Sequence, residues 1–179
     1  LRYKNDSILI SYKTLNKDNP KLNCRLKNLN RFSPRRIVLD NNLDSNMNSY
    51  IVNTSKKDNT IIFYNKASKQ KINFFKKKGI QLIKTNLNKK NYFNLKIILK
   101  KLYIKGCRNL LVEGGNDLSG SFLKKKLFNE FYLFKSPKNL SKLVPYKDFN
   151  HFKHLSQKYK TKKKIETQLG KDSITLYKL

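Results

Sequence analysis

Short apolar runs alternate with amphipathic stretches through the middle of this chain. Runs rich in β-branched and aliphatic residues predict buried strands at 7–11, 36–40, 60–64, 80–83 and 109–113. Apolar residues at helical spacing predict helices at 66–78, 91–105 and 117–126. Gly79 and Gly106 stand where the first two of these helices end. This alternation predicts an α/β sandwich with a mostly parallel sheet, and right-handed crossovers place helices on both of its faces.

The flanking segments carry weaker signals. Polar loops are expected at 12–20 and 28–34, a short extended piece at 22–26, and a minor strand at 50–52. Residues 131–134 predict a further strand that ends before Pro137, and 164–179 predict a hairpin around Gly170 with its last strand at 174–177. Because a hairpin adds antiparallel strands, we expect the sheet to be mixed. Residues 138–160 are polar and basic and give no assignment.

The length of 179 residues suits one domain, and the chain contains no apolar run long enough to cross a membrane. Its first residues lack both an initiator Met and the apolar core of a signal peptide, so we expect a cytoplasmic protein and an excised fragment or domain. Cys24 and Cys107 are expected to be reduced, partly buried thiols, with a disulfide or a metal pair as the alternatives. His151 and His154 are spaced i, i+3 without a nearby carboxylate, so no metal is expected.

A net charge of +30 raises the alternative of a basic nucleic-acid-binding module. Most of the cations are Lys, however, whereas Arg is the side chain that reads bases and phosphates best. The lysines are also spread along the whole chain, and Asn and Ile are abundant beside them, as an A/T-rich genome would produce. We therefore expect a solvated lysine surface that attracts small anions, and no specific nucleic acid.

The segment after the strand at 109–113 is the most informative candidate site. In parallel α/β sheets, ligands bind at the carboxyl ends of the strands. Here Glu113 is followed by Gly114 and Gly115 and then by a helix start, which permits close backbone approach and phosphate binding. The spacing matches neither the dinucleotide fingerprint nor a Walker A loop. An ordinary turn capped by Asp117 remains an alternative, and Glu113 faces either the cleft or the solvent.

Polar residues near the end of the first strand form a second candidate group. Thr14 and Asp18 can hydrogen-bond ribose or amide groups, and the Arg25 guanidinium can bind a phosphate. A plain polar loop is the alternative reading of the same residues.

Five segments carry a resemblance to a known family. They are Arg2 with 6–10, then 14–15 with 18–22 and Arg25, then 34–40, then 111–115 with 118–122, and finally Leu127, Glu130 and Pro137. In this order and spacing they resemble motifs of the C-terminal reductase domain of the bifunctional riboflavin biosynthesis deaminase/reductase. The resemblance runs from about Arg2 to Pro137 and returns weakly near Gly170.

The resemblance implies a dihydrofolate-reductase-like three-layer α/β fold and an NADPH-dependent oxidoreductase. Such an enzyme reduces the ribosyl group of 5-amino-6-(5-phosphoribosylamino)uracil to the ribityl group. It implies substrate contacts at Arg2, Leu22, Arg25 and Glu113, with Glu113 also catalytic. It implies cofactor contacts at Thr14, Asp18, Asn41, Gly114, Gly115, Asn116, Asp117, Leu118, Ser119 and Gly120, and no metal. A homodimer and a fused upstream deaminase domain are further expectations.

The chain also departs from the family pattern. Ser11 and Lys13 replace glycines, Asn19 and Asn129 replace aspartates, and Asn41 stands where Ser is usual. The family's first strand is expected before Arg2, so residues 1–179 are expected to be a reductase domain without that strand. Three alternatives therefore stay open: a dihydrofolate or pterin reductase of the same fold, a nucleic-acid-binding module, and an inactive homologue.

Overall fold

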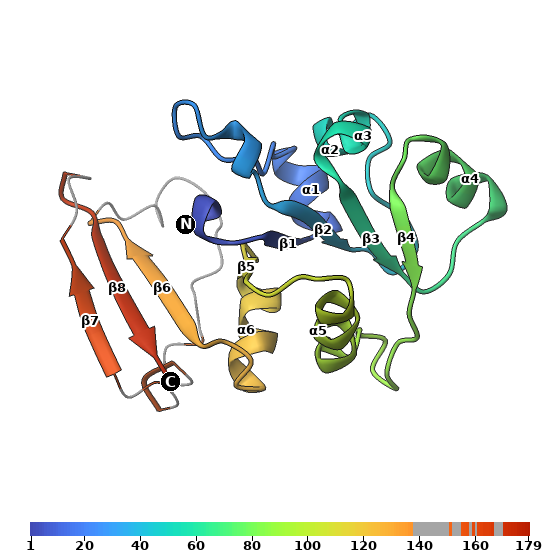
Figure 1. Cartoon of the computed structure of the whole chain (residues 1–179). Coiled ribbons are helices and arrows are strands. Elements are labelled where there is room, and N and C mark those ends of the chain that lie inside the picture. Colours follow the sequence, from blue (N-terminus) through green and yellow to red (C-terminus); the bar gives the residue numbers. More distant parts are fainter. Residues whose placement is uncertain (138–150, 152–154, 158, 160, 167–169) are drawn as a thin grey trace. The chain divides into compact units, whose positions relative to one another are not determined.

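The computed structural model describes residues 1–137, 151, 155–157, 159, 161–166 and 170–179 (Figure 1). The chain forms two compact units, Leu1–Gly115 and Asn116–Leu179. Of the segment 138–160 that gave no sequence assignment, only residues 151, 155–157 and 159 are described.

The first unit is built on a five-stranded parallel sheet. Its strands are β1 (Ser7–Ser11), β2 (Arg35–Leu39), β3 (Thr60–Tyr64), β4 (Gln81–Lys84) and β5 (Leu110–Val112), in the spatial order β4-β3-β2-β1-β5. All neighbouring pairs are parallel. The five predicted strands are confirmed: β1 and β3 have the predicted bounds, and the ends of the other three shift by one residue.

Helices cover both faces of this sheet. They are η1 (Arg2–Lys4), α1 (Tyr12–Asp18), η2 (Asn30–Phe32), α2 (Tyr50–Asn53), α3 (Ser55–Asp58), α4 (Lys69–Lys77) and α5 (Leu95–Ile104). The chain moves in one direction from β1 to β4 and then returns to β5, so right-handed crossovers place α1–α4 on one face and α5 on the other (Figure 1).

The face under α1, α2 and α4 holds the main apolar core. Alternate strand residues point to this face because side chains alternate along a strand. The cluster joins Ile8, Ile10, Val38 and Ile62 of the strands to Leu15, Leu22, Leu43, Ile51, Val52, Phe75 and Ile80. The intervening strand residues Leu9, Ile37, Ile61 and Phe63 are also fully buried, so both faces of the sheet are covered.

Two predictions about local structure were wrong. The loop expected at 12–20 is largely helix α1, which begins because the Ser11 hydroxyl caps it by accepting a hydrogen bond from Thr14 N at 3.3 Å. The minor strand expected at 50–52 is helix α2. Ile51 and Val52 are both completely buried in the same core cluster, and a strand would have pointed them to opposite sides. The extended piece expected at 22–26 forms no strand.

The second unit combines helix α6 (Asn116–Lys124) with antiparallel strands. Helix α6 precedes β6 (Glu130–Lys135), and β7 (Thr161–Ile165) and β8 (Ser173–Lys178) form the predicted hairpin. Their order is β6-β8-β7. Leu123, Leu155 and Tyr159 form its core, and the Tyr159 hydroxyl donates to the Phe128 carbonyl at 3.0 Å. We expected one mixed sheet, but among the described residues the parallel and the antiparallel strands form two separate sheets.

Cys24 and Cys107 are both buried and form no disulfide with each other. In the described part of the chain, no helix has the length and apolarity that crossing a membrane requires.

Candidate functional site

The topology of the first unit locates a candidate ligand site. The chain leaves β1 toward β2 and later comes back to place β5 on the other side of β1. Ligands of open α/β sheets bind at such a switch point, outside the carboxyl ends of the two strands. Here those ends carry Ser11, at the start of α1, and Glu113, which follows β5 directly. The Glu113 N–H donates to Leu9 O at 3.0 Å, which fixes the start of the glycine loop to β1.

An ion pair joins Glu113 to Arg2 at this switch point. Arg2 Nε lies 2.8 Å from Oε1 of Glu113, and Arg2 Nη2 lies 2.8 Å from Oε2, so the pair is bidentate. The hydrogen bond to this carboxylate raises the pKa of the Arg2 guanidinium, against the opposing effect of burial. The two side chains are 19% and 37% exposed. Glu113 is therefore a paired carboxylate at the edge of the site and not a free charge in water.

The segment that contains Leu22 and Arg25 lies beside this pair. Arg2 Nη1 donates to the Asn23 carbonyl at 3.2 Å. Leu22 is buried and has a φ of 57°, a left-handed conformation that costs a non-glycine residue roughly 1–3 kcal/mol. Such strain is typical of functional sites.

A cavity of about 290 Å³ opens next to this segment, with Leu1, Arg2, Tyr3, Cys24, Arg25 and Leu26 in its wall. The structure thus brings the four predicted substrate residues into one region. Arg2 contacts Glu113 directly, Arg25 lines the same cavity as Arg2, and Leu22 anchors the segment in the core.

The first turn of α1 supplies hydroxyl groups to the carboxyl end of β1. Ser11 Oγ and Thr14 Oγ1 are 3.1 Å apart, and both residues are half-buried. Asp18 is exposed at the end of α1, four residues beyond Thr14, so the two side chains share a helix face. Lys13, which replaces a family glycine, is exposed.

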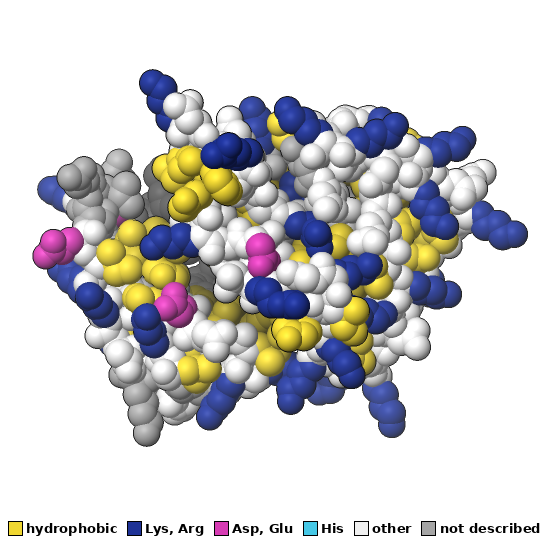
Figure 2. Space-filling view, in the orientation of Figure 1, with side chains coloured by type: hydrophobic (Ala, Val, Ile, Leu, Met, Phe, Trp, Pro, Cys, Tyr) yellow, Lys and Arg dark blue, Asp and Glu magenta, His cyan; other side chains and the backbone are white. Residues whose placement is uncertain are grey.

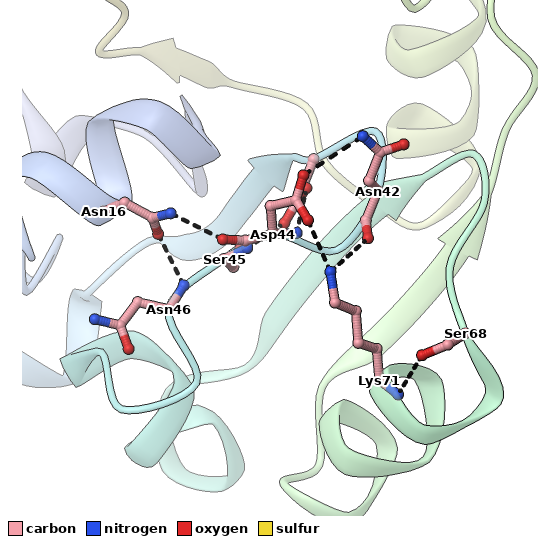
Figure 3. A network of polar contacts seen from close by, with 8 residues as sticks. Asn16, Asn42, Asp44, Ser45, Asn46, Ser68 and Lys71 are labelled. Atoms are coloured by element: carbon pink, nitrogen blue, oxygen red, sulfur yellow. Dashed lines mark hydrogen bonds and ion pairs between the residues drawn. The ribbon is translucent and has the colours of Figure 1, made fainter.

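A polar network closes the loop after β2 (Figure 3). Asp40 is completely buried and accepts hydrogen bonds from Asp44 N at 2.8 Å, Ser45 N at 2.7 Å and Ser45 Oγ at 2.6 Å. Asp44 forms a 2.7 Å ion pair with Lys71 of α4, and Asn16 of α1 binds the Asp44 carbonyl and Asn46 N. The loop is therefore tied to helices on either side of it.

Asn41 joins three loops at this edge of the sheet. Its carbonyl accepts from Asn65 N at 2.9 Å and Lys66 N at 3.1 Å, in the loop after β3. Its Nδ2 donates to Asn91 O at 3.2 Å, in the segment after β4. The sequence analysis selected Asn41 but missed these partners. Their positions in the sequence could have identified them, because they lie in the segments that follow β3 and β4.

The glycine segment divides between the two units. Gly114 and Gly115 end the first unit, and a Cβ added to Gly115 would meet nothing within 4 Å, so its backbone borders open space. Residues 116–120 belong to α6, where Asp117 is exposed and Leu118 is half-buried. Ser119 and Gly120 are buried in this helix. A Cβ on Gly120 would collide with the imidazole of His151, so this glycine has a packing role.

A parallel sheet with charged side chains and a glycine pair at its switch point is typical of ligand-binding α/β domains. Residues 1–166 match the RibD C-terminal domain family, and the chain belongs to that family.

Relatives in sequence agree with this assignment. The chain is 30% identical over 178 residues to the riboflavin biosynthesis protein RibD of Aquifex aeolicus, covering 99% of this chain and 48% of that protein. It is 31% identical over 150 residues to the 5-amino-6-(5-phosphoribosylamino)uracil reductase of Buchnera aphidicola from Acyrthosiphon pisum, covering 78% and 69%. The chain thus spans about half the length of the RibD protein.

Solved structures confirm the fold. A pyrimidine reductase-like protein from Corynebacterium diphtheriae superposes with a TM-score of 0.73 at 16% identity, over 99% of this chain and 77% of that one. The riboflavin biosynthesis reductase Rib7 of Saccharomyces cerevisiae gives 0.69 at 20% identity, over 100% and 77%. The predicted dihydrofolate-reductase-like α/β fold is therefore confirmed.

Proposed function

We propose that this chain catalyses the NADPH-dependent reduction of the ribosyl group of 5-amino-6-(5-phosphoribosylamino)uracil to the ribityl group, a step of riboflavin biosynthesis. The bidentate Arg2–Glu113 pair beside the cavity lined by Arg2 and Arg25 carries this proposal. Membership of the RibD C-terminal domain family supports it, and the Buchnera relative is named for the same reduction.

The cavity chemistry suits a phosphorylated sugar. Two guanidinium groups line it, and Arg binds phosphate oxygens through paired, charge-assisted hydrogen bonds. Glu113 adds a carboxylate that accepts hydrogen bonds from ribose hydroxyls or ring amines. The described residues accept three of the five N–H donors of Arg2, so two remain for a ligand while the ion pair stays intact.

The opposite side of the switch point suits the nicotinamide nucleotide. The Ser11 and Thr14 hydroxyls, the Asn41 amide and the open backbone at Gly115 offer donors and close approach without a large side chain. When bound, NADPH supplies the hydride. The protein holds the substrate in reach of it, and Arg2 fixes the orientation of the Glu113 carboxylate.

We further propose that the chain acts as the reductase part of a longer cytoplasmic enzyme that forms homodimers and carries a deaminase domain upstream. A Thermotoga maritima protein named as a deaminase and reductase is matched over 46% of its length.

Among the described residues, no strand pairs with β5 on the side away from β1. In the register of β5 with β1, the backbone N–H and C=O groups of Leu110 and Val112 face this open side. We propose that the family's first strand pairs there. Extending the chain upstream should then raise both its melting temperature and its affinity for NADPH, and an extension that changes neither would contradict this pairing.

The alternatives make different predictions. A pterin reductase binds antifolates in preference to a phosphorylated pyrimidine. A nucleic-acid-binding module binds RNA or DNA with a steep salt dependence. Figure 2 shows Lys and Arg side chains distributed over the whole visible face and not gathered in one stripe, which does not favour a nucleic-acid track.

The first test is nucleotide binding followed by turnover. Saturable binding of NADPH, measured by nucleotide fluorescence, and reduction of the phosphoribosylamino-pyrimidine are the expected results. Binding without turnover would indicate an inactive homologue, and an absence of binding to NADPH and NADH would refute the proposed function.

A further inference from the structure

We infer that Lys66 and Lys90 form the site for the 2′-phosphate of NADPH, and that this site makes the protein select NADPH over NADH. This inference rests on the proposed function and adds the residues that set its nucleotide specificity. It follows from where three loops meet and from which charges remain available there.

The loops after β2, β3 and β4 converge on Asn41. Lys66 is attached to this junction by its own backbone, since its N–H donates to Asn41 O at 3.1 Å. Lys90 precedes Asn91, whose carbonyl accepts from Asn41 Nδ2 at 3.2 Å. A tight turn presents Lys90, because Asn91 N donates to Asn88 O and Asn88 Oδ1 accepts from Lys90 N, both at 2.9 Å. The two loops that hydrogen-bond to Asn41 therefore each carry an exposed lysine side chain, Lys66 in one and Lys90 in the other.

The carboxylates of this edge are already engaged. An NAD-specific site presents an acid to the ribose 2′-hydroxyl, and that acid repels a 2′-phosphate. Asp40, the acid that follows β2 here, is turned into the protein, with no exposure and three hydrogen bonds. Asp44 is neutralised by Lys71 (Figure 3). The junction therefore presents an amide where an NAD-specific site presents a carboxylate.

Lys66 and Lys90 differ from Lys71 in that neither has an acidic partner among the described residues. A phosphate monoester carries about −1.5 to −2 charges at neutral pH and three acceptor oxygens. Two free ammonium groups on adjacent loops match this charge, whereas the hydroxyl of NADH offers them no charge to bind. The expected outcome is discrimination between the two nucleotides at this end of the molecule.

Charge reversal tests the inference directly. Dissociation constants for NADPH and NADH are measured by nucleotide fluorescence on the unsubstituted protein and on Lys66→Glu, Lys90→Glu and Lys77→Glu. Lys77 is the matched control, since it is exposed at the end of α4, which leads to the opposite edge of the sheet. Adenosine 2′,5′-bisphosphate and adenosine 5′-monophosphate serve as competitors that lack the nicotinamide.

We expect Lys66→Glu and Lys90→Glu to raise the dissociation constants of NADPH and of adenosine 2′,5′-bisphosphate by about tenfold or more. The dissociation constant of NADH should change by less than about twofold. Lys77→Glu should leave the ratio of the two affinities unchanged. Equal losses for NADPH and NADH, or no loss in either lysine variant, would overturn the inference while the proposed function stands. Failure of the unsubstituted protein to bind both nucleotides would instead overturn the proposed function.

Discussion

Replacing Glu113 with Gln separates a functional carboxylate from a structural one. The substitution keeps the shape of the side chain, removes its charge and replaces one carboxylate oxygen by an NH2 group, so Arg2 keeps an acceptor for only one of its two 2.8 Å hydrogen bonds. Removing one partner of a fully buried pair of this kind would cost about 3–5 kcal/mol, because the other charge is left uncompensated. Because Glu113 is 37% exposed, solvent screening reduces the expected loss of unfolding free energy to about 1 kcal/mol. For a chain of this size that corresponds to a fall in Tm of about 2–4 °C.

The expected loss of activity is larger than this stability effect. If Glu113 binds the reacting substrate, kcat/KM should fall by at least about a hundredfold, which corresponds to about 2.7 kcal/mol of transition-state binding. NADPH affinity should stay within about twofold, since the nucleotide is assigned to other groups. Thermal unfolding, nucleotide fluorescence and steady-state kinetics measure the three quantities on the same preparation.

The pair Glu130–Lys178 provides a matched control. Its 2.7 Å ion pair lies in the second unit, with side chains 41% and 50% exposed. Glu130→Gln should lower Tm slightly and leave kcat/KM unchanged. Should Glu113→Gln retain kcat/KM within about twofold of the unsubstituted protein, the carboxylate would have no role beyond holding Arg2, and our assignment of the site would be wrong.

Other parts of the structure give further predictions. Asp40→Ala leaves the N–H groups of Asp44 and Ser45 without their acceptor and should cost about 2–4 kcal/mol in chemical denaturation, and a loss below 1 kcal/mol would contradict the network. Gly120→Ala should destabilise by about 1–3 kcal/mol through its collision with His151, whereas Gly115→Ala, which meets open space, should change Tm little. Burial tends to raise the pKa of Asp6, but hydrogen bonds from Asn109 N, the Ser7 hydroxyl and Arg108 N outweigh it and lower the pKa overall. Asp6 therefore stabilises the fold above its unfolded pKa of about 3.9, and this contribution is lost as the pH falls through the lower folded value. Asp6→Asn should accordingly reduce the loss of unfolding free energy between neutral and acid pH. If that loss were unchanged, the Asp6 carboxylate would not be its source.

The sheet was predictable because its strands are short β-branched runs that are buried on both faces. Helix α1 was not, since Leu15 is its only buried residue and leaves no periodic stripe. Its start depends on Ser11 acting as a cap at the end of an apolar run, a signal that also fits a turn. Tyr50, Ile51 and Val52 have strand-forming side chains, yet tertiary packing overrides that preference and selects a helical turn.

The candidate site was predictable as a set of residues but not as an arrangement. Motif order indicated that Arg2 and Glu113 both belong to the site, but it gave no reason for them to pair across 111 positions. That contact requires β1 to lie beside β5, which is a property of the topology. The junction at Asn41 is hidden for the same reason, since it joins segments after three different strands.

The two regions proposed to bind anions use different physical means, and this difference has a functional consequence. At the switch point, Arg2 is already paired with Glu113 and hydrogen-bonded to Asn23, so its orientation is fixed before any ligand arrives. Little side-chain entropy is lost on binding there, which favours geometric selection of one substrate. At the Asn41 junction, Lys66 and Lys90 are exposed and unpaired among the described residues, so their attraction acts at longer range and is screened by salt. Raising the ionic strength should therefore weaken the binding of NADPH more than the binding of the pyrimidine substrate. If salt weakened the binding of both ligands equally, the preorganisation of Arg2 by Glu113 would not distinguish the two regions.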